Sequence, residues 1–230
     1  MHTSRLPSLF TARPSILATL LTLLLAALMT LLAPSSYADD KGVAKSADDV
    51  APLLIGQKIP KLTLHNSDGK PVKLHKLVKS QPTLVIFYRG GWCPYCNLHL
   101  AELRKLEAPL KEKGVQIVAI TPDRPEELIK TQNKHTLGYT LLSDSDAKAI
   151  KAFGLAFKVG LAMRTTMKTF GINLEEASGQ DHHLLPVPAV YLFNDKGIAT
   201  YNFVAPNYKI RASNRVILAA VEDLLEEGKD

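Results

Sequence analysis

The chain has 230 residues and a formal net charge of +6, with 46% hydrophobic and 22% charged residues. This composition is typical of a globular protein and excludes a chain that is disordered throughout. The length suffices for one sizeable core. The lysines are scattered and form no dense run with the arginines. The charge therefore excludes the clustered basic surface of a nucleic-acid-binding protein and indicates a solvated exterior.

The first 38 residues predict an export signal that is not part of the fold. Arg5 and Arg13 precede an uncharged apolar stretch, residues 16–33, and a short segment then ends at Ala38. This order matches a secretory signal peptide that is cleaved after Ala38. The stretch is also close to the length that spans a bilayer, so an uncleaved anchor is the alternative. In both cases we expect an exported protein, periplasmic or otherwise extracytoplasmic, which contacts a membrane only if the segment stays uncleaved.

The next part of the chain predicts a linker and the first half of one domain. Residues 39–52 are polar and small and favour a linker, so the domain covers 53–230. Alternating and continuous apolar runs then predict secondary structure in this order: a hairpin over 61–65 and 71–74, a buried strand over 83–88, a helix over 97–113 ended by Gly114, and a buried strand over 115–120.

The second half of the sequence predicts further alternation of helices and strands, followed by a hairpin and a last helix. The expected elements are, in order, a helix over 125–135, a strand over 139–142, a helix over 146–153 capped by Ser145, a helix near 161–170 within a long loop, strands over 189–193 and 198–203, and a helix over 212–226. Parallel strand–helix units followed by a hairpin predict a mixed sheet that is covered by helices on both faces.

One segment carries the chemistry: it holds Cys93 and Cys96, the only two cysteines of the sequence. The pair follows the strand over 83–88 and lies where the next helix begins. Free backbone N–H groups and the helix dipole stabilise a thiolate at that place. Arg89 adds a positive charge, and Pro94 suits a first helical turn because it has no N–H group. Position, spacing and neighbours together predict a reactive cysteine pair.

A structural disulfide and a zinc site are the competing uses of such a pair. A bridge that closes so short a loop removes little entropy from the unfolded chain and stabilises little. Zinc would need two further ligands, and His99, His182 and His183 form no usual ligand pattern. We therefore expect neither a metal nor a cofactor.

Other side chains near the pair are secondary candidates. Trp92 directly precedes Cys93, which favours a lid over the sulfurs. His99 lies three residues after Cys96 on the same helical face, a position from which it can tune the thiolate. The histidine pair at 182 and 183 is interpreted as solvated loop residues, with a role as proton donor as the alternative.

The sequence resembles the alkyl hydroperoxide reductase/thiol-specific antioxidant (peroxiredoxin-like) branch of the thioredoxin-fold superfamily, from Ile59 to the C-terminus. The resemblance rests on Phe-Tyr and Trp-Cys-Pro-Tyr-Cys within residues 87–96, on Leu-Leu-Ser-Asp at 141–144, and on Pro-Val-Pro-Ala-Val-Tyr-Leu-Phe at 186–193. It implies an α/β thioredoxin-like fold, with a central mixed sheet flanked by helices and the hairpin as an N-terminal extension. It also implies that the bond before Pro188 is cis and faces the cysteines.

The resemblance leaves the roles of the two sulfurs open. Matched to peroxiredoxins, Cys96 falls on the peroxide-attacking position; matched to thioredoxin, Cys93 attacks and Cys96 resolves. The sequence departs from both patterns. The peroxiredoxin proline is Arg89 here, and the arginine that helps bind peroxide would fall near Pro188, where none is present unless Arg89 substitutes. The buried acid of thioredoxins would fall near Phe87 and is missing.

The sequence thus predicts an exported antioxidant thiol oxidoreductase. A peroxide or a disulfide is the substrate, Cys93 and Cys96 close a disulfide, and an external thiol reductant opens it. Two alternatives stay open: a disulfide reductase without peroxidase activity, and a redox-inert binding module.

Overall fold

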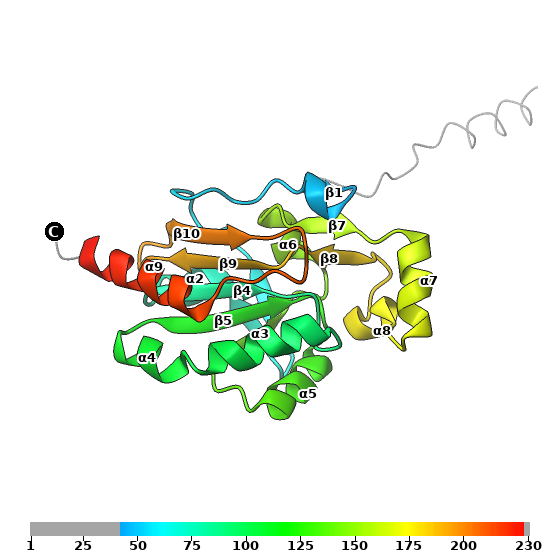
Figure 1. The fold of residues 1–230 in the computed structure, drawn as a ribbon, viewed down its shortest axis with the longest axis horizontal. Coiled ribbons are helices and arrows are strands. Elements are labelled where there is room, and N and C mark those ends of the chain that lie inside the picture. Colours follow the sequence, from blue (N-terminus) through cyan, green and yellow to red (C-terminus); the bar gives the residue numbers. More distant parts are fainter. Residues whose placement is uncertain (1–41, 228–230) are drawn as a thin grey trace, which may run out of the picture. The chain divides into compact units, whose positions relative to one another are not determined.

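The computed structural model describes residues 42–227 (Figure 1). Its strands are β1 (Val43–Ala44), β2 (Thr63–His65), β3 (Pro71–Lys73), β4 (Thr83–Phe87), β5 (Gln116–Thr121), β6 (Thr140–Ser143), β7 (Ala156–Lys158), β8 (Leu184–Pro186), β9 (Ala189–Phe193) and β10 (Ala199–Val204). Its helices are η1 (Ala47–Asp49), α2 (Leu74–Val78), α3 (Pro94–Arg104), α4 (Glu107–Glu112), α5 (Pro125–His135), α6 (Lys148–Ala152), α7 (Leu161–Thr169), α8 (Leu174–Ser178) and α9 (Asn214–Glu227).

The central sheet has seven strands in the order β10-β9-β4-β5-β6-β2-β3. β4, β5 and β6 run parallel, while β9 is antiparallel to both β4 and β10. The mixed sheet, the N-terminal hairpin β2–β3 and the second hairpin β9–β10 confirm the predicted fold. A smaller sheet, β1-β7-β8, adjoins α7 and α8 (Figure 1).

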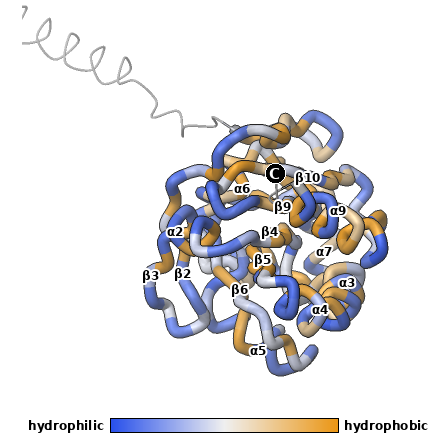
Figure 2. The backbone as a smooth tube through the Cα atoms, turned by 90° about the vertical axis from the view of Figure 1, so that its left-hand side faces the viewer, coloured by the Kyte–Doolittle hydropathy of each residue, from blue (hydrophilic) through white to orange (hydrophobic). Residues whose placement is uncertain are grey.

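Two hydrophobic cores cover the two faces of the central sheet. Every residue of β4 is buried, and neighbours along this strand alternate between the cores. Ile86 packs in the first core, with the apolar face of α3, both cysteines and part of α9. Phe87 packs in the second core, with α2, α6 and the rings of Phe153 and Tyr191. Figure 2 shows α3 and α9 on one side of the apolar strands and α2 on the other.

The single helix expected over 97–113 is wrong, because the chain forms α3 and α4 with a break between them. The N–H of Leu106 bonds to the carbonyl of Leu103 at 2.9 Å, which tightens the chain at the end of α3. Pro109 has no N–H to continue the ladder and fits the first turn of the new helix, α4. The break keeps Leu106 and Leu110 in the first core.

The cap expected at Ser145 is also wrong, because Asp144 performs it. The Asp144 carboxylate accepts the N–H groups of Ala149 at 2.8 Å and Ile150 at 2.9 Å. The helix α6 accordingly begins at Lys148, two residues later than predicted. The carboxyl group of Asp144 satisfies two free backbone donors at once.

The segment predicted as a linker carries regular structure in its described part, residues 42–52. Val43 pairs in parallel with Ala156 of β7, and η1 follows directly. The N–H of Leu53 then bonds to the carbonyl of Phe153 at 2.9 Å. The predicted signal peptide over 1–38 lies outside the described residues. Between residues 42 and 227, no helix has the length and apolar character needed to cross a membrane.

The cis bond expected before Pro188 is wrong, because no peptide bond in the described part of the chain is cis. Residues 186–193 are not one strand: β8 pairs with β7, and β9 pairs with β4. The N–H of Val187 bonds to the carbonyl of Leu155 at 2.9 Å, at the crossing between the sheets. The ordinary trans bond, which is the lower in energy, carries the chain across.

Candidate active site

The cysteine pair lies at the junction of β4 and α3, as the sequence predicts. A turn from Gly90 to Cys93 joins the two elements, since the N–H of Cys93 bonds to the carbonyl of Gly90 at 3.1 Å. Gly90 has φ +156°, and a Cβ on it would lie 2.1 Å from Nε1 of Trp92. Only glycine fits there. Cys93 directly precedes α3, and Pro94 is the first residue of this helix.

The two sulfurs form a coupled pair that holds one thiolate. Cys93 is 2% exposed and Cys96 is fully buried, and neither is in a disulfide. The pKa of Cys93 is lowered to about 6, mainly because the thiol of Cys96 donates a hydrogen bond to its sulfur; the backbone N–H of Cys96 and nearby arginines outweigh the opposing effect of burial. That hydrogen bond and burial raise the pKa of Cys96 well above its usual value. The thiolate therefore resides on Cys93.

Arg211 reaches the pair from a distant part of the chain. Its Nη2 donates to Sγ of Cys96 at 3.6 Å. Its Nη1 donates to the carbonyl oxygens of Tyr208 and Ile210, which fixes the guanidinium in the loop between β10 and α9. Its charge lowers the pKa of both cysteines. The sequence did not predict this residue, because no local motif marks it and 115 positions separate it from Cys96.

Arg89 lies among aromatic rings beside the pair. Its guanidinium carbon is 4.4 Å from the ring centroid of Tyr208 and 5.4 Å from that of Trp92. Tyr208 also makes an edge contact with Tyr95, at 5.6 Å between centroids. These contacts hold a cation whose charge lowers the pKa of Cys93. A role of Arg89 in binding substrate stays a prediction.

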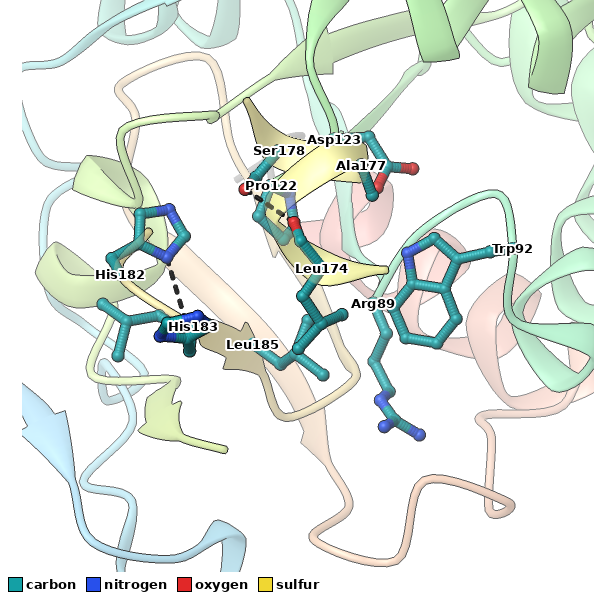
Figure 3. Close-up of a pocket in the computed structure, with 11 residues that line it drawn as sticks. Arg89, Trp92, Pro122, Asp123, Leu174, Ala177, Ser178, His182, His183 and Leu185 are labelled. Carbon is teal, nitrogen blue, oxygen red and sulfur yellow. Dashed lines mark hydrogen bonds between the residues drawn. The ribbon is translucent and has the colours of Figure 1, made fainter. Parts of the chain in front are cut away.

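Trp92 faces a small pocket beside the redox segment (Figure 3). The indole packs against the first core and also against the cluster of Met167, Leu174 and Leu185. It therefore joins α7 and α8 to the redox segment. No contact defines it as a lid over the sulfurs, so that role stays a prediction.

Unpaired polar atoms are concentrated near the cysteines. Within residues 42–227, eleven buried side-chain nitrogen or oxygen atoms have no hydrogen-bond partner, and five of them belong to residues 88–99: Tyr88 Oη, Arg89 Nε, Trp92 Nε1, Asn97 Oδ1 and His99 Nε2. Such atoms are costly to bury and call for a functional explanation. Most of these five are hydrogen-bond donors, which suits a site that receives an oxygen-rich reactant.

The three candidate histidines have different surroundings. Burial and the charge of Arg211 lower the pKa of His99 to about 4, so it is neutral beside the pair. His182 Nε2 lies 2.8 Å from the carbonyl of Ser145. His183 Nε2 lies 2.6 Å from Oε1 of Glu175. His182 and His183 lie in a loop, as predicted, but both are partly buried and hydrogen-bonded rather than fully solvated. In the described part of the chain, no three or more His, Cys, Asp or Glu residues are grouped to hold a metal ion.

Pro188 lies at the same edge of the sheet as the redox segment. Ala189 pairs with Phe87, the last residue of β4, so the preceding Pro188 is beside the start of that segment. Pro188 is buried, and its carbonyl accepts the N–H of Ala205 at 3.3 Å. The contact with the cysteines that the resemblance implies stays a prediction.

Two known proteins are similar in sequence to part of this chain. Peroxiredoxin Bcp of Escherichia coli K12 is 36% identical over 104 residues, which cover 45% of this chain and 66% of the relative. Chloroplastic peroxiredoxin Q of Populus jackii is 34% identical over 100 residues, or 44% of this chain and 46% of the relative. The matches therefore span just under two thirds of the first relative and about half of the second.

Solved structures agree on the fold. Reduced Prx3 of Vibrio vulnificus has a TM-score of 0.61 at 21% identity and covers 74% of this chain and 99% of its own. Peroxidoxin BcpB of Mycobacterium tuberculosis has a TM-score of 0.57 at 18% identity, with 75% and 96% covered. The model of the AhpC/TSA family matches residues 55–202. The protein therefore has the thioredoxin fold in its peroxiredoxin form, and it belongs to the AhpC/TSA family.

Proposed function

We propose that the protein is an antioxidant thiol peroxidase that reduces a small peroxide through Cys93 and Cys96. The observation that carries the proposal is the coupled pair itself: a thiolate on Cys93, a protonated Cys96 that donates to it, and the guanidinium of Arg211 at 3.6 Å from the second sulfur. The names of the relatives, which are peroxiredoxins, support the same chemistry.

The proposed reaction balances with these groups. The thiolate of Cys93 attacks the O–O bond, which leaves a sulfenic acid on Cys93 and releases an alkoxide or hydroxide. The thiol of Cys96 protonates this leaving group. The resulting Cys96 thiolate attacks the sulfenic sulfur, closes the disulfide and releases hydroxide, which takes a proton to become water. An external thiol reductant restores both thiols by exchange. The arginine and the unpaired donors stabilise the negative oxygen as it forms.

The electrostatics favour Cys93 as the attacking sulfur, although the peroxiredoxin alignment places Cys96 in that role. A peroxide reacts with a thiolate, and Cys96 stays protonated while it donates to Cys93. The N-terminal end of α3 gives Cys93 the backbone N–H of Cys96 as a further donor.

Disulfide reduction in other proteins is the second candidate function. The lowered pKa of the first cysteine favours it, since the same thiolate can attack a disulfide. Burial opposes it: Cys93 is 2% exposed and Cys96 is not exposed, so a bulky disulfide cannot approach either sulfur without movement of the segment. A small peroxide has no such requirement.

Parallel assays of the prereduced protein test the proposal. We expect hydrogen peroxide to be consumed with loss of two thiols per molecule, and insulin disulfides to be reduced slowly or not at all. Thiol loss is measured with a chromogenic disulfide, and insulin reduction by turbidity. Rapid insulin reduction without peroxide consumption would establish the disulfide reductase instead, and failure of both would leave the redox-inert binding module.

We also propose that the protein acts outside the cytoplasm. The support is the order of Arg5 and Arg13, the apolar stretch over 16–33 and Ala38. Mass spectrometry of the protein from its native host is expected to find Asp39 as the first residue. An exported full-length chain would favour the anchor, and a full-length cytoplasmic chain would refute export.

A further inference from the structure

A buried carboxylate outside the cysteine pair holds the turn that carries it. Asp123 follows β5 and is 2% exposed. Its Oδ2 accepts the N–H of Gly91 at 2.7 Å. Its own backbone is fixed by two further bonds, because its N–H donates to Oγ1 of Thr121 at 3.3 Å and its carbonyl accepts the hydroxyl of Ser143 at 2.6 Å. The carboxylate is therefore a rigid acceptor at the carboxyl edge of the sheet.

Gly91 is held from several directions. Its carbonyl accepts Nδ2 of Asn97 in α3 at 2.9 Å, opposite the bond from its N–H to Asp123. A Cβ on Gly91 would lie 2.0 Å from Oγ1 of Thr131 in α5. The backbone of the Gly90–Cys93 turn is thus fitted between β5, α3 and α5, and the carboxylate is its charged contact. A shift of Gly91 necessarily moves Cys93, two residues later.

We propose that Asp123 is a positioning residue for the thiol pair: its carboxylate holds Gly91 and so keeps Cys93 at the N-terminal end of α3. This inference rests on the proposed function, because the pair needs positioning only if it reacts. Its test does not depend on that function. Asp123 touches neither sulfur and acts through the backbone of the turn.

The charge of Asp123 responds to pH in the neutral range. Burial raises its pKa to about 7, against the lowering effect of the Gly91 N–H. The titratable and charged groups around it come from every neighbouring element: Tyr88, Arg89, Glu127, His182 and His183. Glu127 is itself bonded to Lys130 at 2.8 Å. A carboxylate accepts a stronger hydrogen bond than a carboxyl group, so the hold on Gly91 weakens as the pH falls through 7.

Protonation of Asp123 weakens its bond to Gly91 but stabilises the folded chain. Because the pKa of Asp123 is higher in the folded chain than in the unfolded chain, the folded state binds the extra proton between pH 3.8 and about 7. The free energy of unfolding therefore decreases as the pH rises through this window. Asp123→Asn removes the loss of stability that comes from ionising this buried carboxyl group, and its amide oxygen still accepts the N–H of Gly91. We expect the variant to be at least as stable as the parent protein at pH 8, so that faster alkylation of Cys93 cannot be assigned to unfolding.

The chain offers a matched control in Asp144. This second carboxyl is also 2% exposed, follows the parallel strand β6, and has its pKa raised to about 7 by burial. It bonds to Ala149 and Ile150 of α6 and has no contact with the redox segment. Asp144→Asn therefore makes the same chemical change at a site that holds a different helix.

The test follows the Gly91 amide by NMR and the alkylation of Cys93 by iodoacetamide, both between pH 5.5 and 8.5. We expect the Gly91 amide to titrate near pH 7 in the parent protein and in Asp144→Asn, and to stay constant in Asp123→Asn. At pH 8 we expect alkylation to become roughly fivefold to tenfold faster in Asp123→Asn alone, because Cys93 is buried and a more weakly held turn exposes it more often. The factor is the difference between a charged and a neutral hydrogen-bond acceptor. A Cys93→Ser background removes any contribution of the thiolate to the Gly91 titration.

A Gly91 amide that does not titrate, or that titrates equally in Asp123→Asn, would overturn the proposal. So would equal alkylation rates in the two Asn variants. If Asp123→Asn does not fold, the parent protein still tests the proposal. The Gly91 amide and the carboxyl carbon of Asp123 should then titrate together in its NMR spectra. Neither readout uses peroxide, so failure of the peroxidase assay and failure of this inference are separate results.

Discussion

Cys93→Ser is expected to slow the reaction of the reduced protein with hydrogen peroxide by about tenfold to 100-fold at pH 7. In the parent protein, the hydrogen bond to Cys93 and burial raise the pKa of Cys96. The variant removes the sulfur that carries the thiolate and leaves Cys96 buried. Part of the loss in rate is recovered, because the thiolate of a thiol with a higher pKa is the stronger nucleophile. Trp92, the only tryptophan of the chain, adjoins Cys93 and provides a fluorescence signal for stopped-flow measurement.

Cys96→Ser is the matched variant. Its hydroxyl still donates to Cys93, so the first reaction with peroxide is expected to proceed at nearly the parent rate and to stop at a sulfenic acid on Cys93. Trapping with a sulfenic-acid reagent and mass spectrometry locate the oxidised residue. A sulfenic acid formed on Cys96 at the parent rate in Cys93→Ser would assign the attack to Cys96, as the peroxiredoxin alignment does.

Arg211→Met is expected to lower kcat/KM for peroxide by roughly 100-fold, the loss typical of a donor that stabilises a developing oxyanion. The guanidinium lies 3.6 Å from Sγ of Cys96, and its charge lowers the pKa of both sulfurs. The pKa of Cys93 should therefore rise, as read from thiolate absorbance against pH. The pKa of His99 should rise as well, since the same charge lowers it in the parent protein.

Two further variants make the result specific. Arg211→Lys keeps the charge but not the planar pair of donors, so an intermediate rate is expected. Arg104→Met changes an exposed arginine at the end of α3, whose Nη1 bonds to the carbonyl of His135 at 3.4 Å, and should leave the rate unchanged. Parent-like kinetics in Arg211→Met, with an unshifted His99, would exclude the guanidinium from the reaction.

The sequence was sufficient for features set by local patterns. The apolar run of β4, the first-turn proline of α3 and the pair Cys93–Cys96 are contiguous, so strand, helix and thiolate site follow from neighbouring residues. The two hairpins follow from alternation around polar turns. These elements need no knowledge of the rest of the chain.

The remainder depends on contacts between distant residues. Asp123 bonds to Gly91 across 32 positions and Arg211 to Cys96 across 115, and neither has a sequence motif. The trans bond before Pro188 reflects the change of sheet between β8 and β9, which is visible only once β7 is placed. The sequence does not distinguish Ser145 from Asp144 as the side chain that accepts the first N–H groups of α6, because both are good acceptors.

The alternation of β4 keeps the redox chemistry and the aromatic packing on separate sides of one strand. Leu84, Ile86 and Tyr88 face the side that holds the cysteines, whereas Val85 and Phe87 face the rings of the second core. Insertion or deletion of one residue in β4 would turn every later side chain of this strand to the opposite face of the sheet. A point substitution in the second core therefore reaches the thiol side only through the strand itself. Residues of the second core can therefore be substituted while the side chains on the thiol face stay the same, but the length of β4 cannot change.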